Sequence, residues 1–201
     1  MRIALIAQPQ LFAHERGRRN GQKGYASLNC IRKPVRLADA KAISLGHAAK
    51  GDGRWRIFVF CDRGNPSAPT SRMKALCDFL ADSSRSPIRK YTTDTQDVDS
   101  VIDLRAIFQQ GHRDLDLGAM PSLLLPPKGR YGLRDYEKMY CADLRSGQDI
   151  FDMRGIDRDR GCMVVVRPDQ YIASILPLNA FADLSLFFEG FMLPKAGDHK
   201  H

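Results

Sequence analysis

The sequence predicts an α/β fold, with a central mixed sheet, flanking helices, and a hairpin plus a helix at the C-terminal end. Three observations favour this fold class. Residues 54–60 largely alternate as a strand does, residues 71–80 follow a helical period, and residues 162–176 contain two strand-like runs around a turn. The chain has 201 residues, of which 43% are hydrophobic, so we expect one domain with a sizeable core.

The first half of the chain is expected to begin the sheet. Residues 24–47 predict an extended first segment that ends in a short helical turn, and residues 54–60 predict a strand. Residues 64–69 form a loop, because Gly and Pro interrupt the pattern. A helix over residues 71–80 follows, whose apolar face belongs to the core and consists of Met73, Leu76, Cys77 and Leu80.

The middle of the chain shows weaker patterns. Residues 98–109 predict a further strand, with apolar side chains at several positions. Residues 111–132 contain three prolines and little regular pattern, so we expect a long loop there. Residues 149–154 predict one or two turns of helix.

The clearest pattern lies near the C-terminal end. Residues 162–166 form a continuous apolar run rich in β-branched side chains, which is typical of a strand covered on both faces. Residues 167–170 supply turn chemistry, and residues 171–176 return as the partner strand. Arg167 and Asp169 are expected to contact each other or the backbone in this turn, and not a substrate.

An apolar helix over residues 180–193 closes the pattern. The order of strand, helix, strand, hairpin and last helix is that of thioredoxin-like proteins. We therefore expect a thioredoxin-like domain over residues 24–193, a poorly ordered basic arm over residues 1–23, and a tail over residues 194–201.

The net charge of +8 lies mainly on the arm. Residues 1–36 hold eight Lys or Arg and one acid, whereas the remaining 165 residues carry a net charge of only +1. Nucleic-acid-binding domains usually carry a basic face on the folded part, so we expect no nucleic-acid partner. No run approaches the length of a membrane span and no export signal is recognisable, which predicts a cytoplasmic protein without a membrane partner.

A thioredoxin-like fold raises the question of thiol chemistry, which requires two cysteines within reach at a helix N-terminus. Cys61 follows the first central strand at the corresponding place, but it stands alone. The five cysteines are dispersed and are expected to be reduced thiols: Cys30, Cys61, Cys77, Cys141 and Cys162. A stand-alone redox protein that uses Cys61 remains the alternative function from the enzyme class.

Other catalytic and binding motifs are weak, and we expect no catalytic, cofactor-binding or metal-ligating residues. The turn at residues 51–53 precedes a strand and does not fit a nucleotide-binding loop. The histidines are not spaced as ligands of one metal: His14, His47, His112, His199 and His201. The carboxylates between residues 135 and 159 alternate with Arg and Lys, which predicts a charge-compensated surface.

Several ordered blocks of the sequence resemble the C-terminal domain of the phenol 2-monooxygenase and 3-hydroxybenzoate 4-monooxygenase family. The likeness extends from about residue 24 to about residue 192. The blocks are VRLADAKAISLGH (35–47), DGRWRIFVF (52–60), DLGAMP (116–121), GLRDYEKMY (132–140), DIFDMRGIDRDRG (149–161), VVVRPDQY (164–171) and FFEGFM (187–192).

The resemblance implies a structural role. Members of this family are FAD-dependent aromatic hydroxylases that use NADPH, and their C-terminal domain is thioredoxin-like and associated with dimerisation. Their flavin and substrate residues lie outside the matched part, so none is assigned here and this chain alone is expected to be inactive. The implied partner is a second copy or an FAD-binding hydroxylase domain, with the last helix and the hairpin as contact elements.

Overall fold

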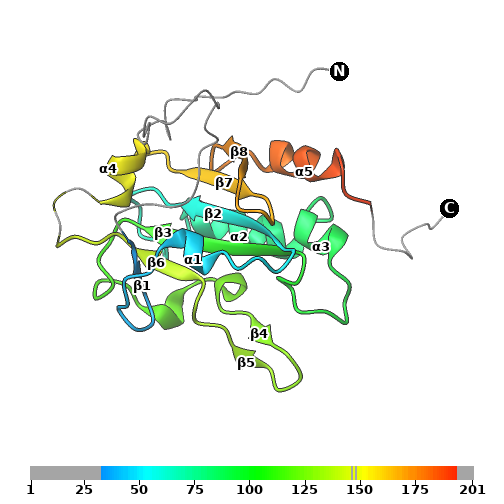
Figure 1. Ribbon diagram of the computed structural model, residues 1–201, viewed down its shortest axis with the longest axis horizontal. Helices are drawn as coiled ribbons and strands as arrows, with labels where there is room; N and C mark the ends of the chain where they lie inside the picture. Colours follow the sequence, from blue (N-terminus) through cyan, green and yellow to red (C-terminus); the bar gives the residue numbers. More distant parts are fainter. Residues whose placement is uncertain (1–32, 146, 148, 194–201) are drawn as a thin grey trace, which may run out of the picture.

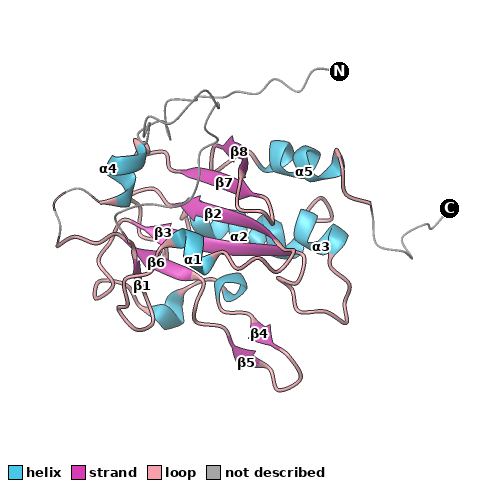
Figure 2. Ribbon diagram, in the orientation of Figure 1, coloured by secondary structure: helices cyan, strands magenta, loops and turns pink. Residues whose placement is uncertain are grey.

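The computed structural model of the chain describes residues 33–145, 147 and 149–193 (Figure 1). The predicted arm, the tail and residues 24–32 of the predicted first segment lie outside the described residues. Helices pack on both faces of a central mixed sheet (Figure 2). This arrangement confirms the predicted α/β class. No helix within the described ranges has the length and apolar character needed to cross a membrane.

The described residues form a main sheet with the strand order β1-β6-β3-β2-β7-β8. Strands β2, β3 and β6 are parallel, whereas β1, β7 and β8 pair antiparallel with their neighbours. A small second sheet pairs β4 (Pro127–Lys128) with β5 (Leu133–Arg134). The strands of the main sheet are β1 (Val35–Arg36), β6 (Met139–Cys141), β3 (Ile102–Phe108), β2 (Trp55–Phe60), β7 (Cys162–Val166) and β8 (Ile172–Leu176).

Different helices cover the two faces. Side chains of α2, α3 and α5 pack on one face, and those of α1 and α4 pack on the other. In Figure 1, α2 passes behind the sheet and α1 lies in front of it. The helices are α1 (Leu45–Ala48), α2 (Arg72–Asp82), α3 (Pro87–Tyr91), α4 (Ile150–Arg154) and α5 (Phe181–Glu189).

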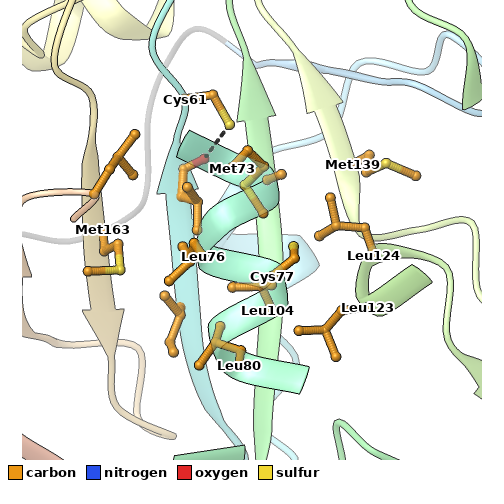
Figure 3. Close-up of a cluster of buried hydrophobic side chains, with 14 of the residues drawn as sticks. Cys61, Met73, Leu76, Cys77, Leu80, Leu104, Leu123, Leu124, Met139 and Met163 are labelled. Atoms are coloured by element: carbon orange, nitrogen blue, oxygen red, sulfur yellow. Dashed lines mark hydrogen bonds between the residues drawn. The ribbon is translucent and has the colours of Figure 1, made fainter. Parts of the chain in front are cut away.

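The unit β2-α2-β3 followed by the hairpin β7-β8 and α5 makes the fold thioredoxin-like, as the order of elements predicts. Helix α2 begins where Ser71 accepts a hydrogen bond from the backbone N–H of Lys74. Its apolar face lies in the core as predicted. Figure 3 shows these side chains packed against β2 and β3: Met73, Leu76, Cys77 and Leu80.

Strand β7 is covered on both faces, as its continuous apolar run predicts. Met163 and Val165 pack with α2 and α5, whereas Val164 and Val166 pack with α1 and α4. Both faces therefore have their own hydrophobic core, and β2 and β7 contribute to each. Burial of β-branched and aromatic side chains on a central sheet is the main source of stability in such a layered fold.

The predicted turn between β7 and β8 is also confirmed. Arg167 donates to the carboxylate of Asp169 at 2.7 Å, so the two side chains pair with each other. The register of β8 shifts between its pairs with Val165 and Val166, and this bulge leaves Ala173 without a partner on β7.

Some element boundaries differ from the prediction. Strand β3 begins at Ile102 and not at residue 98, because the preceding residues form turns. Helix α5 ends at Glu189 and not at residue 193, and Gly190 follows as its C-cap. Helix α3 and strand β6 were not predicted. The long loop over residues 111–132 contains two short 3₁₀ turns, η1 (Leu117–Ala119) and η2 (Ser122–Leu124), and strand β4.

Gly161, which precedes β7, provides a test of how tightly the sheet is packed. Its φ of 62° is left-handed, and an added Cβ would lie 2.4 Å from the carbonyl oxygen of Phe60 and 2.8 Å from Leu178. Gly129 has a similar φ of 60° but open space around it. We expect Gly129→Ala to cost about 1 kcal/mol from its left-handed backbone alone.

Gly161→Ala should cost at least about 2 kcal/mol more than Gly129→Ala, because neighbouring atoms must move to make room. Urea unfolding of both variants, followed by circular dichroism, measures the difference. If both variants lose the same free energy of unfolding, the neighbours of Gly161 have room for a Cβ and the tight packing is contradicted.

Candidate functional site

Cys61 occupies the place where a thioredoxin-like protein would carry its reactive thiol, directly after β2. The residue is buried, and its thiol donates to the carbonyl oxygen of Val59 at 3.8 Å (Figure 3). Burial in the apolar core raises the pKa of the Cys61 thiol well above its ordinary value. A nucleophilic cysteine requires the reverse, an accessible thiol with a lowered pKa.

The other described cysteines have a similar environment. Cys77 and Cys141 are buried and Cys162 is half-buried, and all four described cysteines are free thiols. Burial raises the pKa of Cys141 and of Cys162 to about 12. The hypothesis of a redox protein that uses Cys61 therefore finds no support in the geometry. Cys30 lies outside the described residues.

The remaining sequence candidates do not converge. His47 lies on α1 and His112 in the loop after β3, whereas the other histidines are outside the described ranges. In the described part of the chain, no three His, Cys, Asp or Glu side chains gather as a metal site would require. Residues 51–53 form bends that lead into β2, as predicted.

The prediction of a charge-compensated surface between residues 135 and 159 is wrong at two positions, Lys138 and Asp149, which are both buried. Asp149 caps α4: its carboxylate accepts from the backbone N–H groups of Phe151 and Asp152. Arg158 donates to the same carboxylate at 2.8 Å. The cap is thus held by the side chain of a residue that follows the helix.

Lys138 is the centre of a buried charged cluster. Its side chain is 1% exposed, and its ammonium group donates to the carboxylates of Asp99 and Asp103, with Asp135 3.7 Å away. Asp103 is fully buried within β3, while Lys138 directly precedes β6. The cluster therefore joins neighbouring parallel strands at one end of the sheet.

Arg105 and Tyr140 extend this cluster along the sheet. The Nε of Arg105 donates to Asp103 at 2.8 Å, and one Nη donates to the hydroxyl of Tyr140 at 2.7 Å. The Tyr140 hydroxyl in turn donates to the carbonyl oxygen of Glu137 at 2.8 Å. These bonds hold the guanidinium in one orientation.

Arg56 of β2 completes the cluster. Its side chain is 1% exposed, donates to Asp52 at 2.8 Å, and lies 3.5 Å from Asp103 through Nε. That Nε has no hydrogen-bond partner within the described residues. Sequence reasoning missed this cluster, although Asp103 and Arg105 stand two residues apart in a strand and so must share a face.

The ion pairs set the protonation of the buried carboxylates. Burial raises the pKa of Asp103, but the charges of Arg105 and Lys138 outweigh it, so this pKa lies below its ordinary value. Burial likewise raises the pKa of Asp99, but the charges of Lys138 and Lys128 outweigh burial. The pKa of Asp99 therefore also lies below its ordinary value. Both side chains are therefore held as carboxylates, as their ion pairs require.

Several exposed apolar side chains lie on α5 and in the residues after it. We define the α5 surface as Trp55, Leu186, Phe191 and Leu193. Leu186 is 58% exposed and Phe191 is 48% exposed, although both are large apolar side chains. Phe191 packs against Trp55 with ring centroids 4.8 Å apart, so the outer aromatic side chain rests on the core.

A groove of about 460 Å³ adjoins this surface, between the β7-β8 turn and the end of α5. Trp55 and Phe191 line its apolar side, and Arg167 and Asp169 line its polar side. Aromatic side chains beside a polar rim are typical of protein–protein contact sites. The predicted contact elements, the hairpin and the last helix, thus meet at one place.

Replacement of Lys138 by Met tests the buried cluster. Met keeps most of the apolar stem but leaves Asp99 and Asp103 without their shared cation, so we expect a loss of about 3–5 kcal/mol in the free energy of unfolding. Lys74→Met is the matched control, because Lys74 forms an exposed pair with Asp78 on α2 and should cost less than about 1 kcal/mol.

The stability difference between the native chain and Lys138→Met should also depend on pH. The folded-state pKa values of Asp99 and Asp103 are lowered. Their stabilisation is therefore present above the unfolded pKa of about 3.9 and is lost as the pH falls through the lower folded values. The gap in stability between the native chain and Lys138→Met should shrink on acidification. A gap independent of pH would contradict this account.

Alkylation tests the state of the thiols. In the native protein, we expect Cys61, Cys77 and Cys141 to resist iodoacetamide at mildly alkaline pH, because burial both shields them and raises their pKa values. Unfolding in urea should make all three reactive, as measured by peptide mass spectrometry. Rapid native labelling of Cys61 would restore the redox hypothesis.

Comparison with known proteins agrees with the resemblance. The family model described as the phenol hydroxylase C-terminal dimerisation domain matches residues 31–196. The chain is 52% identical over 159 residues to 3-hydroxybenzoate 4-monooxygenase of Comamonas testosteroni. It is 38% identical over 165 residues to FAD-dependent monooxygenase terD of Aspergillus terreus. These matches cover 79% and 80% of this chain.

The matched part is a small share of each relative. The chain spans about a quarter of their length, 25% and 26% respectively. Among solved structures, the chain is similar to BsSco, a member of the Sco family of cytochrome c oxidase assembly proteins. The TM-score is 0.40 and the sequence identity is 14%, and the match covers 84% of this chain and 97% of BsSco. By its sequence, the chain belongs to the phenol hydroxylase C-terminal dimerisation domain family.

Proposed function

We propose that this chain is the dimerisation module of an FAD- and NADPH-dependent aromatic monooxygenase, and that it associates with a second copy of itself. Membership of a dimerisation domain family supports the association. The relatives, named as monooxygenases, support the kind of parent enzyme. An FAD-binding hydroxylase domain is the other partner that this membership suggests.

The observation that carries the proposal is the exposed apolar α5 surface. Leu186 is exposed on α5, whose residues Leu184 and Phe188 are buried in the core. Phe191 follows the helix and is also exposed. A rigid, preformed apolar surface needs little ordering when it binds, so more of its burial contributes to affinity. Trp55 beneath Phe191 gives the site a well-packed aromatic centre.

The β4-β5 hairpin is a weaker candidate for the contact. It projects from the body of the domain in Figure 1 and exposes Tyr131 and Leu133. Each of its strands has only two residues, and Gly129 and Gly132 in the connecting turn adopt left-handed conformations. Lys128 and the Gly129 N–H tie its first strand to Asp99 and Asp97. Tyr131 and Leu133, however, do not pack on either hydrophobic core, so a contact through them lacks the support that a packed core gives.

We further propose that the chain itself holds neither FAD nor NADPH and carries no reacting group. In this view the parent enzyme performs hydroxylation in its flavin-binding part. The purified chain should accordingly lack flavin absorbance. We also propose a cytoplasmic location, which the free thiols of the described cysteines fit.

Leu186→Glu tests the proposed surface. A carboxylate at the centre of an apolar contact must be buried without a partner, so we expect the dissociation constant of the dimer to rise about 100-fold, which corresponds to roughly 3 kcal/mol. Sedimentation velocity over a dilution series measures the shift. Circular dichroism should show an unchanged fold, since Leu186 is exposed.

Leu133→Glu on the β4-β5 hairpin is the matched control, and the dimer should keep its affinity. Dissociation by Leu133→Glu and not by Leu186→Glu would move the contact to the hairpin. A native chain that remains monomeric at all concentrations would contradict self-association, and would leave the FAD-binding domain as the partner.

A further inference from the structure

A pocket of about 410 Å³ opens beside the charged end of the sheet, on the face covered by α1. Side chains from α1, β3, β6 and the β4-β5 hairpin line it. Two carboxylates line it, those of Asp135 and Glu137. The lining also contains six Lys or Arg side chains: Arg36, Lys50, Arg54, Arg105, Lys128 and Arg134.

Ion pairs within the domain already occupy four of these cations, including Arg105, which pairs with Asp103. Arg36 pairs with Asp39 and Glu137. Arg54 pairs with Asp52 and Lys128 with Asp99, and these two carboxylates do not line the pocket. In contrast, Lys50 and Arg134 have no ion-pair or hydrogen-bond partner for their side chains among the described residues. The pocket therefore keeps uncompensated positive charge on its rim.

Arg105 provides a fixed cation at the inner wall. The residue is 7% exposed, and its Nε and one Nη are held by Asp103 and by Tyr140. Its second Nη makes no hydrogen bond within the described residues. This nitrogen is also not fully buried, so it is accessible to solvent. This nitrogen therefore faces the open space of the pocket, as a donor already oriented by its neighbours.

The walls around this donor are partly apolar. Ile43 and Ala48 lie on the α1 side and Leu133 on the hairpin side, and the ring of Tyr140 completes the inner wall. A guanidinium with an open N–H beside apolar walls matches an organic carboxylate, whose charged end takes the donor while its body covers the walls. Inorganic phosphate would satisfy only the cations.

We propose that this pocket binds a small organic carboxylate. The carboxylate accepts from the free Nη of Arg105, and Lys50 and Arg134 attract it at the rim. The site is separate from the α5 surface, because the two share no lining residue. Its occupancy is therefore independent of dimerisation through the α5 surface.

The experiment uses the full chain and two probes with the same ring, benzoate and neutral benzyl alcohol, together with acetate and inorganic phosphate. Binding is followed by amide chemical shifts in NMR titrations at low ionic strength. We expect saturable binding of benzoate, with shifts centred on residues 43–50 and 133–140. Benzyl alcohol should not bind, and acetate and phosphate should bind more weakly than benzoate.

A pair of matched variants tests the rim. Lys50→Ala combined with Arg134→Ala should weaken benzoate binding about five- to tenfold, because two exposed charges are lost near the carboxylate. Arg63→Ala combined with Arg160→Ala removes the same charge from exposed positions that do not line the pocket, and affinity should stay the same.

Arg105→Lys keeps the charge of the inner wall but loses the planar fork, so benzoate affinity should fall although the fold is retained by circular dichroism. The proposal is overturned if benzoate does not bind saturably, if the two rim variants weaken binding equally, or if phosphate binds as tightly as benzoate.

Discussion

The contact of the Lys138 ammonium with its buried carboxylates is the constraint on which the rest of the sheet depends. Asp103 lies within β3 and Asp99 just before it, so one cation holds the start of β3 to the start of β6. Each carboxylate loses hydration when it is buried, and only direct pairing compensates for that loss. The strands can thus pair only in the register that brings these groups together.

This constraint divides one face of the sheet into two parts. Phe58 and Phe60 of β2 pack under α1 and α4, whereas Arg56 of the same strand belongs to the charged cluster. Apolar side chains cannot cover charged groups at low cost, and the apolar residues of the short helices α1 and α4 pack only on the apolar part. The pocket beside Arg105 lies where this helical cover ends.

The elements that the sequence predicts well are those whose pattern is local. The four apolar positions of α2 repeat at helical spacing, and the run before Arg167 is long enough to identify β7. Strand β6 has three residues, of which Met139 is one, and no period can be read from so short a run. Helix α3, with five residues, is missed for the same reason.

The burial of Lys138 could not be predicted in this way. Its neighbours in the sequence, Glu137 and Tyr136, are exposed, and its two main partners lie 35 and 39 residues away. A charged side chain is far more often exposed than buried, so the local pattern favours a surface. Only the pairing of β3 with β6 brings the compensating carboxylates to it.

The edges of the sheet bear on how such a domain can associate. Strand β1 has two residues and carries the ion-paired Arg36, and β8 is interrupted by the bulge at Ala173 and followed by Pro177, which has no N–H to donate. Neither edge offers a long regular run of free backbone groups for a strand of another chain. These edges favour association through side chains over strand addition, which agrees with our proposal that the apolar side chains on and after α5 form the contact.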